Sequence, residues 1–283
     1  MPVSSYEPLP HTDPTFPVIF HLDRLSQAVQ AHWHEGIELL YCLEGTAEVT
    51  ADMDTRAMRP GELSIIPSGA LHYIAPVPGA ACRYYCLIVD PSLLEGTSLP
   101  GEKTSLQRQV NDPQVQALYL QLAQELEARE PYYRDAAKSL IRLLFTRLSR
   151  CWSTGEERQP AATGHQPEMV KQAILYLQAH YKEEVCVDDV CRHVGFSKYY
   201  FCHSFRRVTG RSVMAYVQDL RCAYARQLLQ EGCTVSECAA RCGFSDVSYF
   251  TRVFRRQTGR LPSRYREEHR ETQKISAAPT EHD

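Results

Sequence analysis

The sequence has no long apolar run and no closely paired cysteines. No window of about 18 uninterrupted apolar residues occurs in the 283-residue chain, and residues 1–10 have neither a basic flank nor an apolar stretch. None of the eleven cysteines belongs to a Cys-x-x-Cys pair, so we interpret them as reduced thiols. We therefore expect a cytoplasmic protein with no membrane partner.

The chain as a whole also lacks a basic excess. Its 34 acidic and 31 basic side chains give a formal net charge of −3, whereas DNA-binding proteins usually carry a basic footprint. The charge is unevenly divided, because residues 1–164 hold 13 basic and 20 acidic side chains and residues 165–270 hold 17 and 11. Residues 192–266 alone hold 14 basic and 4 acidic side chains. This asymmetry indicates a sensor or enzyme joined to a polyanion-binding segment.

Chain length and a change of periodicity predict two domains. Short β-like runs broken by glycine and proline indicate a β-barrel or sandwich, and helical spacing begins after Pro113. The β-like runs are 16–22, 37–43, 47–51, 62–66 and 83–89, and the first two helices are expected at 113–127 and 132–150. The predicted organisation is a sensing domain (1–112), a helical region (113–152), a polar linker (153–167), an all-helical domain (168–270) and a disordered tail (271–283).

An internal repeat is the most informative feature of the basic half. The run GFSKYYFCHSFRRVTG at 195–210 recurs as GFSDVSYFTRVFRRQTG at 243–259. The leading glycines suit a turn that favours positive φ, and Ser197 and Ser245 suit the N-cap of the helix that follows. With the upstream helices expected at 187–194 and 235–242, each copy predicts a helix, a turn and a second helix.

The second helix of each copy is expected to enter the major groove of double-stranded DNA. Arg252 suits a bidentate contact with guanine, worth about 1–3 kcal/mol of discrimination, and Tyr199 and Val247 suit contacts with a thymine methyl group. The alternative is a solvated, arginine-rich helix face. Asp246 is a further position in the second copy that is not needed for packing of the helix against the core. The candidate base readers are Lys198, Tyr199, Cys202, His203, Val247, Ser248, Thr251 and Arg252, and the candidate phosphate contacts are Arg206, Arg207, Arg255 and Arg256.

The basic half resembles the C-terminal domain of the AraC/XylS family of bacterial transcription regulators. The residues that carry the resemblance are Gly243, Phe250, Phe254, Gly259, Pro262, Tyr265 and Arg266. The resemblance implies two helix-turn-helix units on adjacent major-groove segments, with RNA polymerase as a partner. It also implies a homodimer formed through helices 113–127 and 132–150, although their apolar stripes could equally cover the barrel. Cys202 and His203 depart from the polar or basic residues expected in the first unit.

The acidic half contains a histidine cluster. In the run HWHEGIE, His32, His34 and Glu38 share one parity, so an extended strand would point all three side chains to one face. His72 is expected on a second strand. The spacing resembles the two motifs of the cupin barrel, with departures at Ser26 and Pro76. The matching residues are His32, His34, Glu38 and Gly45 in the first motif, and Gly61, Pro67, Gly69 and His72 in the second.

Three imidazoles and a carboxylate allow more than one use. His32, His34, Glu38 and His72 could hold a divalent metal such as zinc, iron, manganese or nickel. They could instead contact a small-molecule effector without metal, or hydrogen-bond one another as a structural cluster. We expect no required cofactor.

Together these features predict a two-domain α+β protein. Its N-terminal part is expected to be a cupin (double-stranded β-helix) barrel with a helical hairpin, and its C-terminal part an all-α double helix-turn-helix. The leading hypothesis is a sequence-specific transcription regulator, expected to be an activator and not an enzyme, whose barrel senses a small molecule such as a sugar or related metabolite. The alternative is a metal-dependent cupin enzyme fused to a DNA-binding domain, although no nucleophile–base pair or phosphate loop is recognisable.

Overall fold

The computed structural model describes residues 13, 15–25, 28–77, 81–96, 109–153 and 165–268. The chain divides into two compact units, Tyr6–Pro167 and Glu168–Asp283. Residue Ser26, residues 154–164 of the expected linker and the expected tail 271–283 lie outside the described residues. Within the described ranges, no helix is long and apolar enough to cross a membrane.

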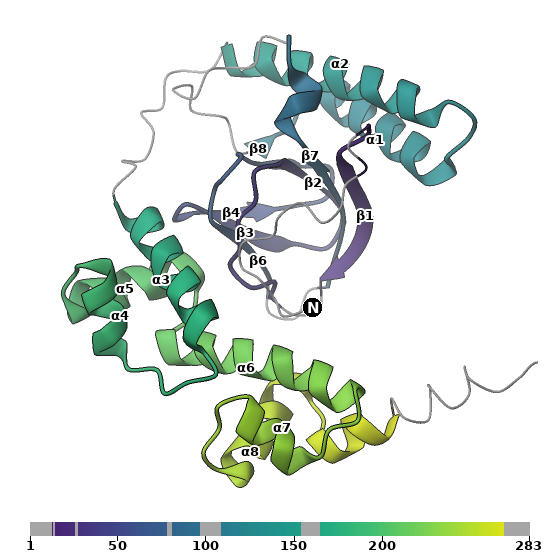
Figure 1. The fold of residues 1–283 in the computed structure, drawn as a ribbon. Helices are drawn as coiled ribbons and strands as arrows, with labels where there is room; N and C mark the ends of the chain where they lie inside the picture. The colour runs from purple at the N-terminus through teal and green to yellow at the C-terminus, as the bar shows by residue number, and fades with distance from the viewer. Residues whose placement is uncertain are drawn as a thin grey trace, which may run out of the picture. The chain divides into compact units, whose positions relative to one another are not determined.

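The N-terminal unit is built on two antiparallel sheets (Figure 1). The larger sheet has the order β1-β7-β2-β5-β8 and the smaller has the order β4-β3-β6. The five predicted β-like runs correspond to β1, β2, β3, β5 and β7, and the predicted histidine-bearing strand corresponds to β6. The strands are β1 (Val18–Leu25), β2 (Ile37–Glu44), β3 (Ala47–Ala51), β4 (Asp54–Met58), β5 (Leu63–Ile66), β6 (His72–Pro76), β7 (Cys82–Val89) and β8 (Gln109–Val110).

Strand β2 is buried on both faces. Leu40 and Cys42 belong to the apolar core between the two sheets, whereas Leu39 and Tyr41 belong to a second core on the outer face of the larger sheet. This double burial explains why β2 is a nearly continuous apolar run rather than an alternating one. It also explains why the polar residue Glu38, which has the parity of Leu40, points into the interior of the barrel.

The helical hairpin covers the outer face of the larger sheet. A short 3-10 helix, η1 (Pro91–Leu94), precedes α1 (Pro113–Ala128) and α2 (Tyr133–Ser153). Helix α1 begins at an N-cap, Asp112, whose carboxylate accepts hydrogen bonds from the Gln114 and Val115 amides. Tyr119 of α1 stacks on Tyr41, with ring centroids 5.3 Å apart. Both predicted apolar stripes therefore pack against the barrel.

The C-terminal unit is entirely helical in the part that the structure describes (Figure 1). The pairs α4–α5 and α7–α8 are the two predicted helix-turn-helix units, and α6 joins them. Phe201 and Phe205 of the first unit and Phe250 and Phe254 of the second are fully buried, as their spacing predicts. The helices are α3 (Gln166–His180), α4 (Val187–Val194), α5 (Lys198–Thr209), α6 (Val213–Gln230), α7 (Val235–Arg241) and α8 (Val247–Thr258).

The predicted N-cap at Ser245 is wrong. Helix α8 begins one residue later, with Asp246 as the N-cap, and the Asp246 carboxylate accepts a hydrogen bond of 2.5 Å from the Tyr249 amide. A carboxylate also complements the positive end of the helix dipole, which favours Asp246 over the preceding serine. In the first unit Ser197 is the N-cap, as predicted. The shift explains why the two copies are offset by 48 residues before the helix and by 49 within it.

Candidate functional site

The backbone brings two distant histidines together inside the N-terminal unit. His32 and His72 form an isolated antiparallel bridge, in which each amide donates to the other's carbonyl at 2.9 Å. Glu38 lies on β2 between Ile66 of β5 and Ile88 of β7. His34 is held by its carbonyl, which accepts a hydrogen bond of 2.9 Å from the Gly69 amide.

The predicted single strand through His32, His34 and Glu38 is wrong in its backbone. Strand β2 begins at Ile37, and the chain bends at Glu35 and Gly36. The bend is stabilised by Ser68, whose hydroxyl donates to the Glu35 carbonyl at 2.7 Å. The three side chains converge nevertheless. Their convergence results from this bend together with the bridge between His32 and His72, and not from the alternation of side chains along one strand.

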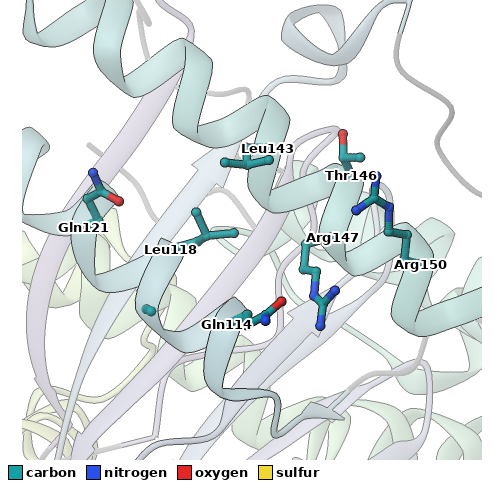
Figure 2. A pocket seen from close by; sticks show the side chains of 8 residues that line it. Gln114, Leu118, Gln121, Leu143, Thr146, Arg147 and Arg150 are labelled. Carbon is teal, nitrogen blue, oxygen red and sulfur yellow. The ribbon is translucent and has the colours of Figure 1, made fainter.

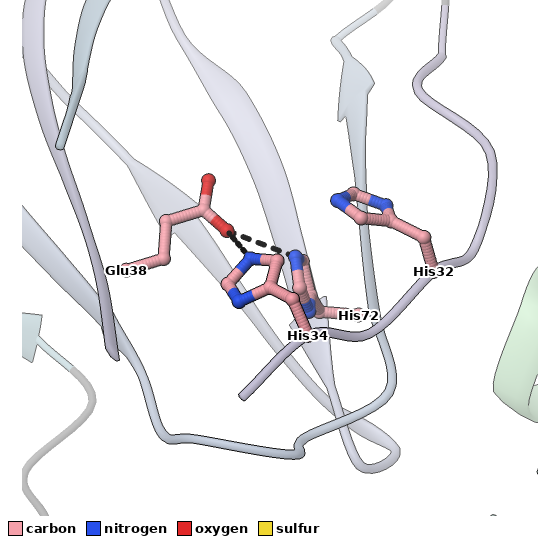
Figure 3. Close-up of side chains that lie close together, drawn as sticks. All are labelled: His32, His34, Glu38 and His72. Atoms are coloured by element: carbon pink, nitrogen blue, oxygen red, sulfur yellow. Dashed lines mark hydrogen bonds and ion pairs between the residues drawn. The ribbon is translucent and has the colours of Figure 1, made fainter. Parts of the chain in front are cut away.

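The four predicted residues form one cluster, which we call the His–Glu cluster (Figure 3). One ligand atom from each of His32, His34, Glu38 and His72 lies within 4.8 Å of the others. Oε2 of Glu38 is 3.2 Å from Nε2 of His34 and 2.9 Å from Nε2 of His72. His34, Glu38 and His72 are buried, and His32 is partly exposed.

Backbone carbonyls fix the orientation of all three imidazoles. Nδ1 of His32 donates to the Gln30 carbonyl at 2.9 Å, Nδ1 of His34 to the Gly36 carbonyl at 3.0 Å, and Nδ1 of His72 to the Ala70 carbonyl at 2.8 Å. A carbonyl oxygen can only accept, so each Nδ1 carries the hydrogen. Each Nε2 is then available as a lone pair directed at the cluster, unless a second proton is bound.

The charges within the cluster are strongly coupled. Burial raises the pKa of Glu38, but the neighbouring His72 and His34 outweigh this effect and hold that pKa well below its usual value. Burial lowers the pKa of His72, whereas the Glu38 carboxylate outweighs burial and raises it above the usual value. For His32, burial and repulsion from His72 lower the pKa to about 4. The cluster therefore favours an ionised Glu38 and a neutral His32, and it stabilises the protonated form of His72.

One buried nitrogen in the cluster lacks a well-formed hydrogen bond. Nε2 of His72 is within ion-pair distance of Glu38, but its geometry does not satisfy a hydrogen bond. Three nitrogens held by carbonyl-bonded imidazoles, together with a carboxylate, are a donor set that fits a divalent metal. The same set also fits a polar organic molecule that offers hydroxyl groups.

Cys86 belongs to this site and is not among the residues predicted from the sequence. Its thiol donates to Oε1 of Glu38 at 3.3 Å, and it lies opposite Leu40 in the pairing of β7 with β2. Glu38 thus has His34 and His72 at one oxygen and Cys86 at the other. The parity of Cys82, Tyr84 and Cys86 along β7 is the signal that places this thiol inside the barrel.

The candidate DNA-reading residues lie on the exposed faces of α5 and α8. Tyr199 is 84% exposed, and Val247 is 41% exposed. Cys202 and Thr251 are only partly exposed, so they offer less surface than the others. The exposed candidates are Lys198, Tyr199, His203, Val247, Ser248 and Arg252 among the base readers, with Arg206, Arg207, Arg255 and Arg256 among the phosphate contacts.

Several of these basic side chains are already engaged within the domain. Lys198 forms an ion pair of 3.0 Å with Asp188 on α4, and Arg256 donates a hydrogen bond of 2.8 Å to Gln218 on α6. The guanidinium carbon of Arg252 lies 5.7 Å from the ring centroid of Tyr249. These contacts orient Lys198, Arg252 and Arg256 without burying them.

Two family models match the chain. Residues 19–145 match the model described as "AraC-like ligand binding domain", and residues 190–268 match the model described as "Helix-turn-helix domain". The chain is 28% identical over 258 residues to the HTH-type transcriptional activator RhaR of Escherichia coli (strain K12), covering 86% of this chain and 89% of that protein. It is 24% identical over 277 residues to the uncharacterized HTH-type transcriptional regulator YdeC of Bacillus subtilis (strain 168), covering 90% and 94%.

Solved structures of regulators are also similar to the chain. Unsaturated fatty acid bound ToxT from Vibrio cholerae matches with a TM-score of 0.47 and 13% identity, covering 88% of this chain and 94% of that chain. The DNA-binding domain of AdpA in complex with a target DNA matches with a TM-score of 0.35 and 28% identity, covering 36% and 94%.

The fold, the double helix-turn-helix and the matched models define a DNA-binding transcription regulator with a ligand-binding domain. The chain belongs to the AraC family of transcriptional regulators. The predicted family, fold class and regulatory function are therefore confirmed, while the individual roles of the site residues stay predictions.

Proposed function

We propose that the protein is a transcription activator whose barrel binds a small polar effector at the His–Glu cluster. The observation that carries this proposal is the convergence of three histidines and a carboxylate within an otherwise apolar core. Burying such groups is unfavourable, and an apolar core of similar volume is often at least as stable. Their presence in a ligand-binding domain is therefore best explained by a ligand.

The chemistry of the cluster favours a sugar or a related metabolite. Ionised Glu38 accepts hydrogen bonds from hydroxyl groups, and imidazole nitrogens accept or donate according to their protonation. The name of the relative RhaR as an activator supports an activating output. For such an output we expect the DNA-bound protein to contact RNA polymerase and to act in the cytoplasm.

The effector site can be tested by replacing two of its histidines. We expect His34→Gln with His72→Gln to abolish the response of a promoter reporter to the effector, because both imidazoles that contact Glu38 are lost. DNA affinity without effector is expected to stay unchanged. The matched control is His21→Gln, which alters an exposed histidine of the same barrel that pairs with Asp23. An unchanged response in the double variant would show that the effector does not bind at the cluster.

A metal-bound cluster is a second candidate, favoured by the buried Nε2 of His72 that lacks a hydrogen bond. Nε2 of His32, His34 and His72 and a carboxylate oxygen of Glu38 would hold a divalent cation, which would supply a positive charge for binding an oxygen atom of the effector. Elemental analysis of the purified protein tests this candidate. A stoichiometric iron or manganese content with O₂-dependent turnover would instead support a metal-dependent enzyme.

Both α5 and α8 are proposed to read adjacent segments of the major groove. Arg252→Ala is expected to weaken specific binding by about 1–3 kcal/mol and to relax the preference at one base pair. Arg255→Ala, at an exposed position of the same helix, is the control for a phosphate contact and should weaken binding on all sequences. A uniform loss for Arg252→Ala would assign that residue to the backbone of DNA.

The outer surface of the helical hairpin is the proposed homodimer contact (Figure 2). A groove of about 380 Å³ between α1 and α2 is lined by Gln114, Ala117, Leu118, Gln121, Leu143, Thr146, Arg147 and Arg150. Leu143 is 52% exposed there, although the buried stripes of both helices already pack on the barrel. Sedimentation analysis should show a dimer that Leu143→Asp converts to a monomer. Leu22→Asp, at an exposed leucine of β1, should leave the dimer intact.

A further inference from the structure

The two helix-turn-helix units are connected by more than helix α6. The segment Tyr181–Glu183, which follows α3, approaches the turn of the second unit. A Cβ atom placed on Gly243 would lie 2.4 Å from the Lys182 carbonyl oxygen and 2.8 Å from its carbonyl carbon. Real Cβ atoms do not come so close to backbone atoms, so the two backbones are in direct contact and only glycine fits.

A single arginine holds both sides of this contact. From the middle of α6, Nε of Arg221 donates to the Tyr181 carbonyl at 2.6 Å, and Nη2 donates to the Glu183 carbonyl at 2.7 Å. The guanidinium carbon also lies 5.3 Å from the ring centroid of Phe244, the residue after Gly243. Arg221 therefore touches the segment after α3 and the turn of the second unit at once.

Lys182 contributes its side chain as well as its backbone. Its Nζ lies 4.0 Å from the ring centroid of Tyr224 on α6, within the range of a favourable cation–π contact. The rings of Tyr181 and Tyr224 pack edge to face at 6.1 Å. These contacts fix the Tyr181–Glu183 segment against α6, while the contact at Gly243 fixes it against the turn that precedes α8.

The first unit provides an internal comparison. Gly195 occupies the same place in the repeat and has nearly the same φ, +77° against +79° for Gly243, but no atom lies within 4 Å of a Cβ placed there. The backbone conformation alone thus accounts for Gly195. At Gly243 the close approach to Lys182 is an additional requirement, which comes from the contact with the segment that follows α3.

We propose that Arg221, Lys182 and Gly243 form a brace within the C-terminal unit that sets the distance and angle between α5 and α8. The brace thereby sets the spacing of the two DNA segments that the protein recognises. Arg221 acts as a positioning residue and does not itself read bases. This inference rests on the proposal that both α5 and α8 contact DNA. A protein with the brace should bind a site of one spacing far better than a site with an extra base pair, because one base pair rotates the second segment by about 34°.

The test uses the full chain and a DNA duplex that the wild-type protein selects from a random-sequence pool. Footprinting locates the two contacted segments, and a second duplex has one base pair inserted between them. The measured quantity is the spacing penalty, the ratio of Kd for the second duplex to Kd for the first. We expect a penalty of about tenfold or more for the wild-type protein and about threefold or less for Arg221→Met, which loses two charge-assisted hydrogen bonds.

Arg226→Met is the matched control, because it removes one positive charge from an exposed position of the same helix. Its spacing penalty should equal that of the wild-type protein. A wild-type penalty in Arg221→Met would overturn the brace. If Arg221→Met does not fold by circular dichroism, Arg221→Lys decides, with a reduced penalty supporting the brace and a wild-type penalty overturning it. A wild-type protein with no spacing penalty would overturn the two-reader proposal as well.

Discussion

The two helix-turn-helix units share a sequence repeat and a backbone course, yet their turns have different surroundings. Phe196, after the first turn, is 37% exposed and stacks on Tyr200, with ring centroids 5.4 Å apart. Phe244, after the second turn, is only 6% exposed and packs on Phe250 at 5.1 Å. The repeat therefore specifies local geometry, whereas neighbouring elements decide how much each repeated position contributes to stability.

The helix that precedes the turn is also better capped in the second unit than in the first. Helix α7 begins with a capping box, in which the Thr234 hydroxyl accepts from the Glu237 amide and the Glu237 carboxylate accepts from the Thr234 amide at 3.0 Å. The N-cap of helix α4 is Cys186, whose side chain makes no capping hydrogen bond. The second unit is thus better supported at its turn and at the start of its first helix.

Removing the aromatic ring after each turn should give the largest difference between the units. Phe244→Ala is expected to lower the free energy of unfolding by about 3–4 kcal/mol, because it leaves a cavity beside Phe250. Phe196→Ala should lower it by less than about 1 kcal/mol, since that ring is partly solvated. Urea unfolding of the full chain followed by circular dichroism measures both values. Equal losses would show that the exposed ring is supported by something other than its stacking on Tyr200.

Adding a methyl group to each turn glycine should also destabilise the second unit more than the first. Gly195→Ala is expected to cost about 1 kcal/mol, the penalty of a left-handed backbone for a residue with a Cβ atom. Gly243→Ala carries that penalty and also a clash with the Lys182 carbonyl, so we expect about 2–3 kcal/mol. The midpoint of thermal unfolding should fall further for Gly243→Ala. Identical midpoints would mean that the Lys182 segment moves away without loss.

Changes at the helix caps should have the smallest effects and opposite signs. Thr234→Ala removes half of a capping box and is expected to cost about 1 kcal/mol. Cys186→Ser adds a hydroxyl at an N-cap whose side chain accepts no capping hydrogen bond from a backbone amide, so we expect a gain of about 0.5 kcal/mol. Amide hydrogen exchange in the first turns of α4 and α7 reports each effect locally. A loss of protection in α4 of Cys186→Ser would show that the thiol has another role.

Local patterns allowed much of the C-terminal unit to be predicted. The bounds of α4 agree with the predicted helix at 187–194, because an apolar stripe and a terminal glycine mark both ends. The start of α8 was missed because Ser245 and Asp246 both suit an N-cap. The sequence alone does not show which of the two side chains accepts a hydrogen bond from an amide of the first turn. The contact at Gly243 was equally invisible, because it depends on a segment about 60 residues earlier in the chain.

The barrel was less predictable because its site depends on pairing between distant strands. The residues of the His–Glu cluster were identified from their spacing, but the bend at Gly36 and the bridge between His32 and His72 were not. Cys86 was missed because its position depends on the register of β7 against β2. Strand β4, with the sequence DTRAM, was missed because it has no run of apolar residues and lies at the edge of its sheet.

The double burial of β2 has a mechanical consequence. Glu38 faces the His–Glu cluster, while the carbonyl of the next residue, Leu39, accepts a hydrogen bond of 3.1 Å from the Tyr119 hydroxyl of α1. A single layer of β-sheet, which contains β2, therefore separates the cluster from the helical hairpin. Glu38 and Leu39 are consecutive residues of one strand and cannot shift independently. A displacement of Glu38 therefore also moves the Leu39 carbonyl, to which Tyr119 of α1 is hydrogen-bonded.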